Sequence, residues 1–254
     1  MLLALFGALL IGLALGLLGS GGSILTVPIL VYLVGQPEKL AIAGSLAIVG
    51  GIALAGALPW TLKREVDLRS LLWFGLPGMA GTWAGAWASQ WFSGAAQLAL
   101  FAMVMLLVAA MMFRSPVSTS AGARPPRGRF AIVGDGLAVG AITGLVGVGG
   151  GFLIVPALVL LGRLSMQKAI GTSLWIIAMK SFTGFAGYLP MLEKQGLQLD
   201  WPLIGLFIAI GAGGTLVGMQ LASRLPQQTL KRAFALFLLL MGVYIIARTA
   251  PQLI

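Results

Sequence analysis

Two short clusters of glycine and serine have the composition of an anion-binding site. The first comprises Gly19, Ser20, Gly21, Gly22 and Ser23, and the second comprises Gly147, Gly149, Gly150 and Gly151. Side chains do not cover the backbone N–H groups of glycine, and an apolar stretch typical of a helix follows each cluster. The free N–H groups at a helix N-terminus attract anions. We therefore expect both clusters to bind an anion, although close helix packing at small residues is an alternative explanation.

Hydroxyl groups follow each cluster at equivalent places in the next apolar segment. Ser45 lies in the sequence Ala-Ile-Ala-Gly-Ser-Leu, and Thr172 and Ser173 lie in the sequence Ala-Ile-Gly-Thr-Ser-Leu. A hydroxyl can donate a hydrogen bond to an oxyanion. The alternative is that each hydroxyl donates to a carbonyl one turn earlier in its own helix. The symmetric placement favours contact with a substrate.

Lys180 is the charged residue that lies deepest in a predicted membrane segment, the one at residues 168–189. It follows Ser173 by about two helical turns, so the two side chains share one face of a helix. A charge inside a membrane segment is costly and suggests a functional site, and an anion is the natural partner of an ammonium group. The equivalent residue in the first half is Ile52, so the site is predicted to be asymmetric. Snorkelling of Lys180 to the interface is the alternative.

The acidic residues offer few candidates for coupling. Asp135 is the only acid within an apolar segment, and it could carry a proton that couples transport to a gradient. An ion pair with Arg129, or a role at a helix start, explains Asp135 as well, and we favour such a structural role. Asp67 and Asp200 precede apolar segments and are predicted helix N-caps.

The composition is that of a membrane protein that spans the bilayer several times. Of 254 residues, 59% are hydrophobic and only 9% are charged, against about 25% charged residues in soluble domains. The net charge of +10 comes from Lys and Arg between the apolar runs, where such residues set orientation, so we expect no nucleic-acid partner. The chain has no Cys and no His, which excludes thiol chemistry and common zinc sites. We expect no metal, no cofactor and no enzymatic activity.

Four tryptophans lie near the ends of apolar segments, where an aromatic belt would place them in the membrane interface. They are Trp60, Trp73, Trp91 and Trp201.

The elements that must position these residues form an internal repeat. Apolar segments fall at residues 2–18, 22–34, 40–58, 69–91, 96–113, 130–147, 150–162, 168–189, 202–222 and 229–247. Residues 169–174 resemble residues 41–46, and they are separated from them by the same number of positions that separates Gly147 from Gly19. Further pairs of similar residues follow in the same order in the two halves. We therefore predict an all-α polytopic membrane protein with a first repeat at 1–125, including a polar central linker, and a second at 126–254.

The charges between the segments predict that the two repeats have inverted topology. Each repeat begins with a re-entrant or broken helical hairpin that carries its glycine cluster, and continues with three full transmembrane helices. With the arginine-rich linker in the cytoplasm, this arrangement puts more Lys and Arg inside than a parallel repeat does. Both termini are then periplasmic. The two hairpins enter from opposite sides, and their tips are predicted to meet near the midplane.

The doubled glycine cluster with its downstream proline, followed by the Ala-Ile-Gly-Thr-Ser-Leu sequence, resembles the TauE/SafE sulfite exporter family of anion permeases. The matching residues are 19–28, 41–46, 147–156 and 169–174. The first copy departs slightly from the pattern, with Ser20 and Ser23 around its glycines. The resemblance implies a location in the bacterial inner membrane and a substrate class of small sulfur-containing anions, such as sulfite or organosulfonates.

The predicted function is that of a secondary membrane transporter, a permease or exporter, that holds a small anion at the two hairpin tips and works by alternating access. A passive anion channel is one alternative. A membrane-embedded enzyme or assembly factor is another, which the lack of His, Cys and paired acids disfavours. Membrane lipid and a coupling proton or sodium ion are further expected partners. The sequence leaves open the direction of transport, the particular anion and whether the chain forms a homo-oligomer.

Overall fold

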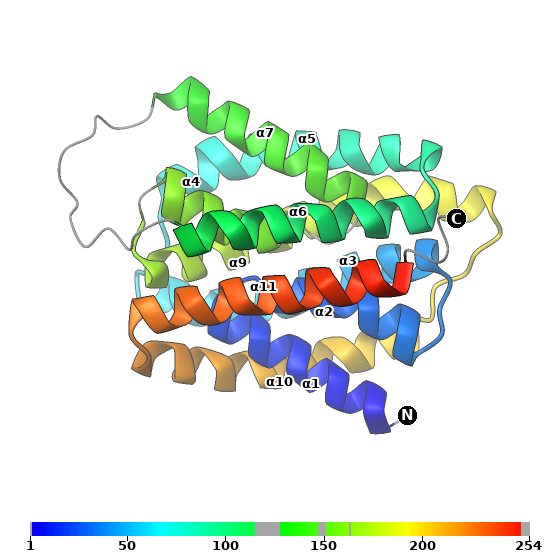
Figure 1. Cartoon of the computed structure of the whole chain (residues 1–254), viewed down its shortest axis with the longest axis horizontal. Coiled ribbons are helices and arrows are strands. Elements are labelled where there is room, and N and C mark those ends of the chain that lie inside the picture. Colours follow the sequence, from blue (N-terminus) through cyan, green and yellow to red (C-terminus); the bar gives the residue numbers. More distant parts are fainter. Residues whose placement is uncertain (1, 115–127, 147–150, 163, 250–254) are drawn as a thin grey trace.

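A computed structural model of the chain describes residues 2–114, 128–146, 151–162 and 164–249 (Figure 1). Every regular element in these ranges is helical, so the predicted all-α class is confirmed. The elements η1, η2 and η4 are π-helices and η3 is a 3₁₀-helix. In chain order the elements are α1 (Leu2–Leu18), α2 (Gly21–Pro28), η1 (Ile29–Leu33), α3 (Glu38–Leu62), α4 (Leu68–Ser70), η2 (Leu71–Gly75), α5 (Leu76–Ala88), η3 (Ser89–Trp91), α6 (Gly94–Arg114), α7 (Arg129–Val146), α8 (Gly151–Pro156), η4 (Ala157–Leu161), α9 (Met166–Lys194), α10 (Trp201–Arg224) and α11 (Gln227–Thr249).

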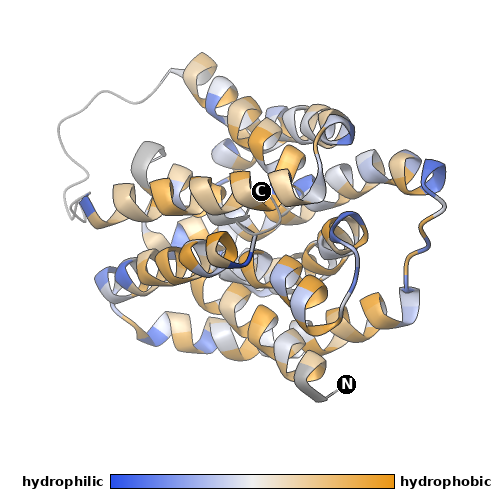
Figure 2. Ribbon diagram, turned by 45° about the vertical axis from the view of Figure 1, so that its right-hand side comes forward, coloured by the Kyte–Doolittle hydropathy of each residue, from blue (hydrophilic) through white to orange (hydrophobic). Residues whose placement is uncertain are grey.

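Five helices in the described part of the chain are long and apolar enough to cross a membrane, namely α3, α6, α9, α10 and α11. The predicted segment 69–91 is helical throughout, but the type of helix changes along it, from α4 to η2, α5 and η3. Pro77 lies in the first turn of α5 and has no N–H to donate, which accounts for the change of helix type next to it. Figure 2 shows hydrophobic residues along the helices and hydrophilic residues mainly near their ends.

The first predicted hairpin is formed by α1, a turn at Gly19 and Ser20, and α2 continued by η1. Gly19 has φ of +72°, a conformation in which glycine avoids the steric penalty of a side chain. Pro28 ends α2 and the π-helical turn η1 follows it directly, and Pro156 precedes η4 in the same way. A proline in a helix removes one hydrogen bond of the ladder, so the matching prolines give each half a similar break.

The four most extensive helix pairings each join the first half of the chain to the second. They are α1 with α10, α5 with α7, α3 with α9, and α6 with α11. In two of these pairs glycines face backbone atoms of the partner so closely that a Cβ atom would overlap them. Glycine is the residue that lets helix backbones approach in this way. The pairs of close-packed residues are Gly12 with Gly211, Gly16 with Thr215, Gly140 with Gly78, and Gly144 with Thr82.

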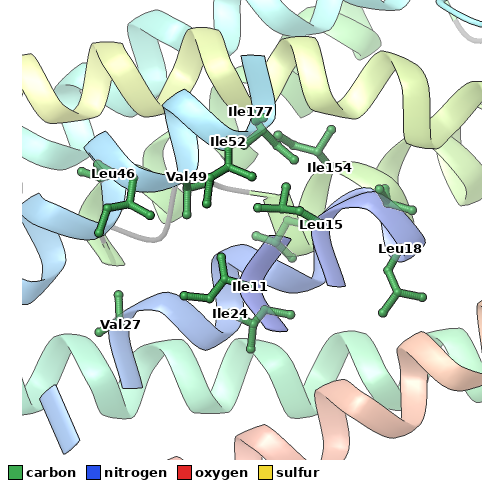
Figure 3. Packing of buried hydrophobic residues seen from close by; sticks show 14 of the residues in the cluster. Ile11, Leu15, Leu18, Ile24, Val27, Leu46, Val49, Ile52, Ile154 and Ile177 are labelled. Atoms are coloured by element: carbon green, nitrogen blue, oxygen red, sulfur yellow. The ribbon is translucent and has the colours of Figure 1, made fainter. Parts of the chain in front are cut away.

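The helices α3 and α9 run antiparallel through the middle of the structure. Gly50 lies against Phe182, whereas Gly56, which comes later in α3, lies against the earlier residue Leu174 of α9. The apolar core fills the space between this pair and the first hairpin, where buried side chains from α1, α2, α3, α8 and α9 meet (Figure 3). Because this core is continuous with both halves, it fixes the hairpin against α9.

Both ends of the described chain lie at the same end of the bundle. Figure 1 shows the start of α1 and the end of α11 on its right, and the ends of α6 and α10 on its left. The right-hand end carries Lys39, Lys194 and Arg248, near the start of α3 and the ends of α9 and α11. The left-hand end carries most of the described basic residues: Lys63, Arg64, Arg69, Arg114, Lys168, Arg224 and Arg232.

Candidate functional site

The tip of the first hairpin is closed to solvent. Residues 19–23 are all buried, and Ser20 and Ser23 have no exposed surface. Ser23 uses its hydroxyl within the tip, where it donates to the Ser20 carbonyl at 2.7 Å. Gly22 packs directly against the backbone of Ile11 in α1, and a Cβ atom would overlap the Ile11 carbonyl. Gly22 is therefore explained by close packing of α1 on α2, whichever ligand the tip binds.

Ser20 stands at the N-terminus of α2 and does not use its hydroxyl to cap that helix. It occupies the N-cap position, but its side chain makes no capping hydrogen bond. Its Oγ atom is buried and has no hydrogen-bond partner among the described residues. A buried hydroxyl without a partner is costly, and a ligand oxygen at the helix N-terminus would satisfy it.

Ser173 joins the first hairpin to α9. Its hydroxyl lies 2.9 Å from the carbonyl oxygen of Gly19 and 2.8 Å from that of Ile170, one turn earlier in its own helix. Because a hydroxyl has one hydrogen to donate, these carbonyls share it in this conformation. Ser173 thus holds the tip in place here, and its oxygen can still accept a hydrogen bond.

The other two predicted hydroxyls also make contacts within the protein. The Thr172 hydroxyl accepts a hydrogen bond from the backbone N–H of Asp67 at 2.8 Å, and so anchors the connection between α3 and α4 to α9. Asp67 itself caps α4, as predicted, by accepting from the N–H of Ser70 at 2.8 Å. Ser45 donates to the carbonyl of Ile42 at 2.8 Å. This is a bond to a carbonyl one turn earlier in the same helix, the alternative to substrate contact given above.

Lys180 lies at the centre of α9, equally far from Met166 and Lys194. The residue has no exposed surface, and its Nζ atom has no hydrogen-bond partner among the described residues. In this conformation the ammonium group does not snorkel to an interface. It instead lies 4.6 Å from the centre of the Phe74 ring in η2, a cation–π distance. Its Nζ is also close to Gly78 of α5, which faces Gly136 of α7, so we call this contact between α5 and α7 the Lys180 seam.

A glycine makes room for the Lys180 side chain. A Cβ atom on Gly78 of α5 would overlap both Cε and Nζ of Lys180. A glycine also makes room for Ile52, the residue of α3 that is equivalent to Lys180. A Cβ on Gly211 of α10 would overlap the end of the Ile52 side chain. The central helix of each half therefore packs one side chain against a glycine of the other half. This side chain is the apolar Ile52 in the first half and the charged Lys180 in the second.

Ser173 lies against the first hairpin tip, whereas Lys180 lies about 10 Å further along α9 at 1.5 Å per residue. The end of α7 that leads into the second cluster is held still further along, at Tyr188. By the same rise, Ser173 and Tyr188 are about 22 Å apart. That the two hairpin tips meet near the midplane stays a prediction, and α2 and α8, the helices that follow the two clusters, are in contact with each other. The second cluster itself, Gly147, Gly149 and Gly150, lies outside the described residues, and Gly151 begins α8.

Asp135 is half-buried on α7, immediately before Gly136. The carbonyl of Gly136 lies 3.1 Å from the Cβ position of Gly78, the glycine that Lys180 touches. The α7 backbone next to Asp135 therefore borders the seam that holds the ammonium group.

The chain matches the family model of the sulfite exporter TauE/SafE over residues 4–245. It belongs to the TauE/SafE family. The resemblance seen in the sequence is thereby confirmed. A probable membrane transporter protein of Xylella fastidiosa (strain 9a5c) is 34% identical over 252 residues, which cover 96% of this chain and 94% of that protein. The probable membrane transporter protein YunE of Bacillus subtilis (strain 168) is 28% identical, with 91% of each chain covered. No solved structure matches the chain.

This TauE/SafE family member is a membrane transporter with several membrane-crossing helices. Its structure adds a polar network at the end of α7 that the sequence did not lead us to expect. Lys39 donates to the carbonyl of Ser89 at 2.8 Å and to the Gln97 side chain at 2.7 Å. Gln97 in turn donates to Tyr188 and to the Leu145 carbonyl. The repeat contained a signal, because Tyr188 stands where the first half has Ala57.

The structure also corrects the prediction for one of the four tryptophans. Trp60 is only 2% exposed and is part of the core, whereas Trp91 is 63% exposed and Trp201 58%. The buried Trp60 lies at the end of α3, beside Gly171 of α9. Position near a segment end could not distinguish these residues, because burial depends on which helix packs over that end.

Proposed function

We propose that this TauE/SafE protein is a secondary transporter that moves small sulfur-containing anions, such as sulfite or organosulfonates, across a bacterial inner membrane by alternating access. The family supports the class of substrate, and the buried polar groups around α9 supply an electrostatic reason for it. The anion rests in turn at a hairpin tip and at the centre of the membrane, while the two halves rock to expose one side and then the other.

Lys180 carries the proposal. An ammonium group that is fully buried at the middle of a membrane-crossing helix, without a hydrogen-bond partner among the described residues, is very costly to desolvate. A passing anion would offset that cost, because two opposite charges attract strongly where water is excluded. Lys180 therefore lowers the barrier that an anion meets at the centre of the bilayer.

The first hairpin tip provides the second resting point. The N–H groups at the start of α2, with the unpartnered Ser20 hydroxyl beside them, form a set of donors at the positive end of a helix. Gly19 and Gly22 pack closely on α9 and α1 and so fix that backbone in place, and Ser173 holds it against α9. Ser45 and the second glycine cluster are proposed to play the same part in the other half.

The topology proposed from the sequence fits this mechanism. Two inverted repeats, 1–125 and 126–254, place one hairpin on each side of the centre, consistent with the contacts at Ser173 and Tyr188. The end of the bundle that carries most of the described Lys and Arg is then cytoplasmic, and both termini are periplasmic. Asp135 lies on the helix that borders the Lys180 seam, and carrying a coupling proton there is the alternative to the structural role that the sequence favours.

The test is transport by purified protein in proteoliposomes, with wild type compared with Lys180→Met. Methionine has nearly the length of lysine without its charge, so the seam stays filled. We expect the variant to fold and to lose sulfite flux by at least about tenfold, the cost of one lost charge interaction of about 1.4 kcal/mol or more. The matched control is Ile52→Met at the equivalent position of the first half, where flux should stay near the wild-type value.

Thermal shifts with sulfite, sulfate, thiosulfate, taurine and sulfoacetate identify the ligand, because a compound that binds the folded state raises its melting temperature. Saturable, gradient-driven flux distinguishes a transporter from a passive channel. Unchanged sulfite flux in Lys180→Met would show that Lys180 does not lower the barrier to the anion, and would contradict the proposed mechanism. The absence of a shift or flux with every sulfur anion would remove the proposed substrate class.

A further inference from the structure

Trp60 has a buried hydrogen-bond donor for which the described part of the chain supplies no acceptor. The residue is 2% exposed, and its indole Nε1 atom has no hydrogen-bond partner among the described residues. An indole nitrogen can only donate a hydrogen bond, so it needs an acceptor atom beside it. Burying it without an acceptor destabilises the protein, unless an acceptor arrives with a ligand.

The neighbouring tryptophan shows that this region can satisfy an indole. Trp175 donates from Nε1 to the Thr61 hydroxyl at 2.7 Å, although it is less buried than Trp60. Thr61 directly follows Trp60 in α3. Of these two neighbouring tryptophans, only Trp60 therefore has an indole N–H without an acceptor among the described residues.

Trp60 lies against the same turn of α9 as the first hairpin tip. A Cβ atom on Gly171 would lie 3.1 Å from the Cβ of Trp60. On the adjacent face of that turn, a Cβ on Gly19 would lie 2.8 Å from the Cα of Ile170 and 2.9 Å from the hydroxyl of Ser173. Residues 170–173 of α9 thus separate Trp60 from the tip by less than one helical turn.

The tip contributes its own unpartnered donor. Ser20 follows Gly19 directly, has no exposed surface and has no partner for its hydroxyl among the described residues. A cation also lies nearby, because the Lys63 Nζ atom is 5.5 Å from the centre of the Trp60 ring. Two buried neutral donors without a partner among the described residues thus lie beside one turn of α9, next to the N-terminus of α2.

We propose that Trp60 Nε1 and Ser20 Oγ donate hydrogen bonds to one small sulfur oxyanion held at the first hairpin tip, so that Trp60 is a substrate-binding residue of the transporter. This inference rests on the proposed function and adds a residue to its site. A sulfur oxyanion presents several acceptor oxygens, so it accepts from both side chains and from the α2 N-terminus together. Neutral donors bind it less tightly than an ion pair would, which permits release.

The test replaces single donors while keeping the shape of each side chain. Trp60→Phe removes the indole N–H and retains an aromatic ring, and Ser20→Ala removes the hydroxyl. Each is expected to weaken the apparent affinity for sulfite by about tenfold, as the loss of one hydrogen bond in a dry site does. The affinity is measured from thermal shifts over a sulfite titration and from the KM of flux into proteoliposomes.

Two controls separate ligand binding from structure. Trp175→Phe removes an indole that the protein already satisfies, so it should lower the melting temperature and leave the affinity for sulfite unchanged. Trp60→Phe removes an unsatisfied donor, so without ligand its melting temperature should stay level or rise. A Trp60→Phe protein that is less stable but binds sulfite with wild-type affinity has lost only packing, and overturns the inference.

The remaining outcomes distinguish this inference from the proposed function. Wild-type affinity in both Trp60→Phe and Ser20→Ala, with flux lost in Lys180→Met, rejects the donor pair and keeps the transporter mechanism. A wild-type protein that binds none of the sulfur anions rejects both proposals. A double variant that is no weaker than either single one supports a single oxyanion bound by the two donors together.

Discussion

The hydroxyl of Ser173 in α9 lies 2.9 Å from the carbonyl oxygen of Gly19, at the turn of the first hairpin. These residues are 154 positions apart in the sequence, and this contact joins the two halves of the chain at a glycine cluster. In an alternating-access transporter, such a contact couples the position of one half to the shape of the site in the other.

Replacing Ser173 with alanine should destabilise the protein, because the Gly19 carbonyl loses its partner from α9. We expect a cost of about 1 kcal/mol, which lowers the melting temperature by about 2–4 °C in a chain of this size. The control is Ser223→Ala, which removes an exposed hydroxyl that donates to the Gln220 carbonyl of its own helix. Equal melting temperatures in the two variants would contradict a structural role for the Ser173 contact.

Three glycines should differ in their tolerance of alanine in a fixed order. Gly19 has φ of +72° and is crowded by Ile170, Gly35 has φ of +79° in open space, and Gly205 has neither constraint. Alanine at Gly35 should cost about 1 kcal/mol through backbone strain alone, and alanine at Gly19 should cost more because its neighbours must also move. Gly205→Ala should be neutral or stabilising, since alanine favours a helix. Melting temperatures of the three variants check this order.

The tyrosines of α9 and η1 should respond differently to loss of the hydroxyl. Tyr188 donates to the carbonyls of Gly144 and Leu145 at 3.2 and 3.1 Å, whereas the Tyr32 hydroxyl has no partner among the described residues. Tyr188→Phe should therefore cost about 1 kcal/mol, while Tyr32→Phe should be neutral or stabilising. Thermal unfolding of both variants decides the point, and a larger loss in Tyr32→Phe would count against the described network.

Labelling of single cysteines tests the proposed orientation, and the chain contains no cysteine that would interfere. Leu62, 86% exposed at the end of α3, and Gln195, exposed just after α9, lie at opposite ends of the bundle. A reagent that cannot cross membranes should label Gln195→Cys in intact cells and should label Leu62→Cys only after lysis. The reverse pattern would place the termini in the cytoplasm and reject the proposed orientation.

Several features of the fold followed from the sequence because they depend on composition and order alone. The low share of charged residues predicts membrane crossing, and the matched positions of Gly19 with Gly147 and of Ser45 with Ser173 predict two related halves. The N-caps at Asp67 and Asp200 were also predictable, because a cap acts only on the next three residues of its own chain. Composition, the order of matched positions and N-caps can be read from the sequence alone, because none of them depends on which distant residues pack nearby.

What the tertiary structure decided is which surface each of these residues meets. Trp60 and Trp91 both stand near segment ends, yet one is 2% exposed and the other 63%, because only Trp60 is covered by α9. Lys180 could be recognised as unusual from its place in an apolar segment, but its position against Phe74 and Gly78 requires the packing of α5 on α9. Burial and partners are sums over contacts between distant segments, so no stretch of sequence contains them by itself.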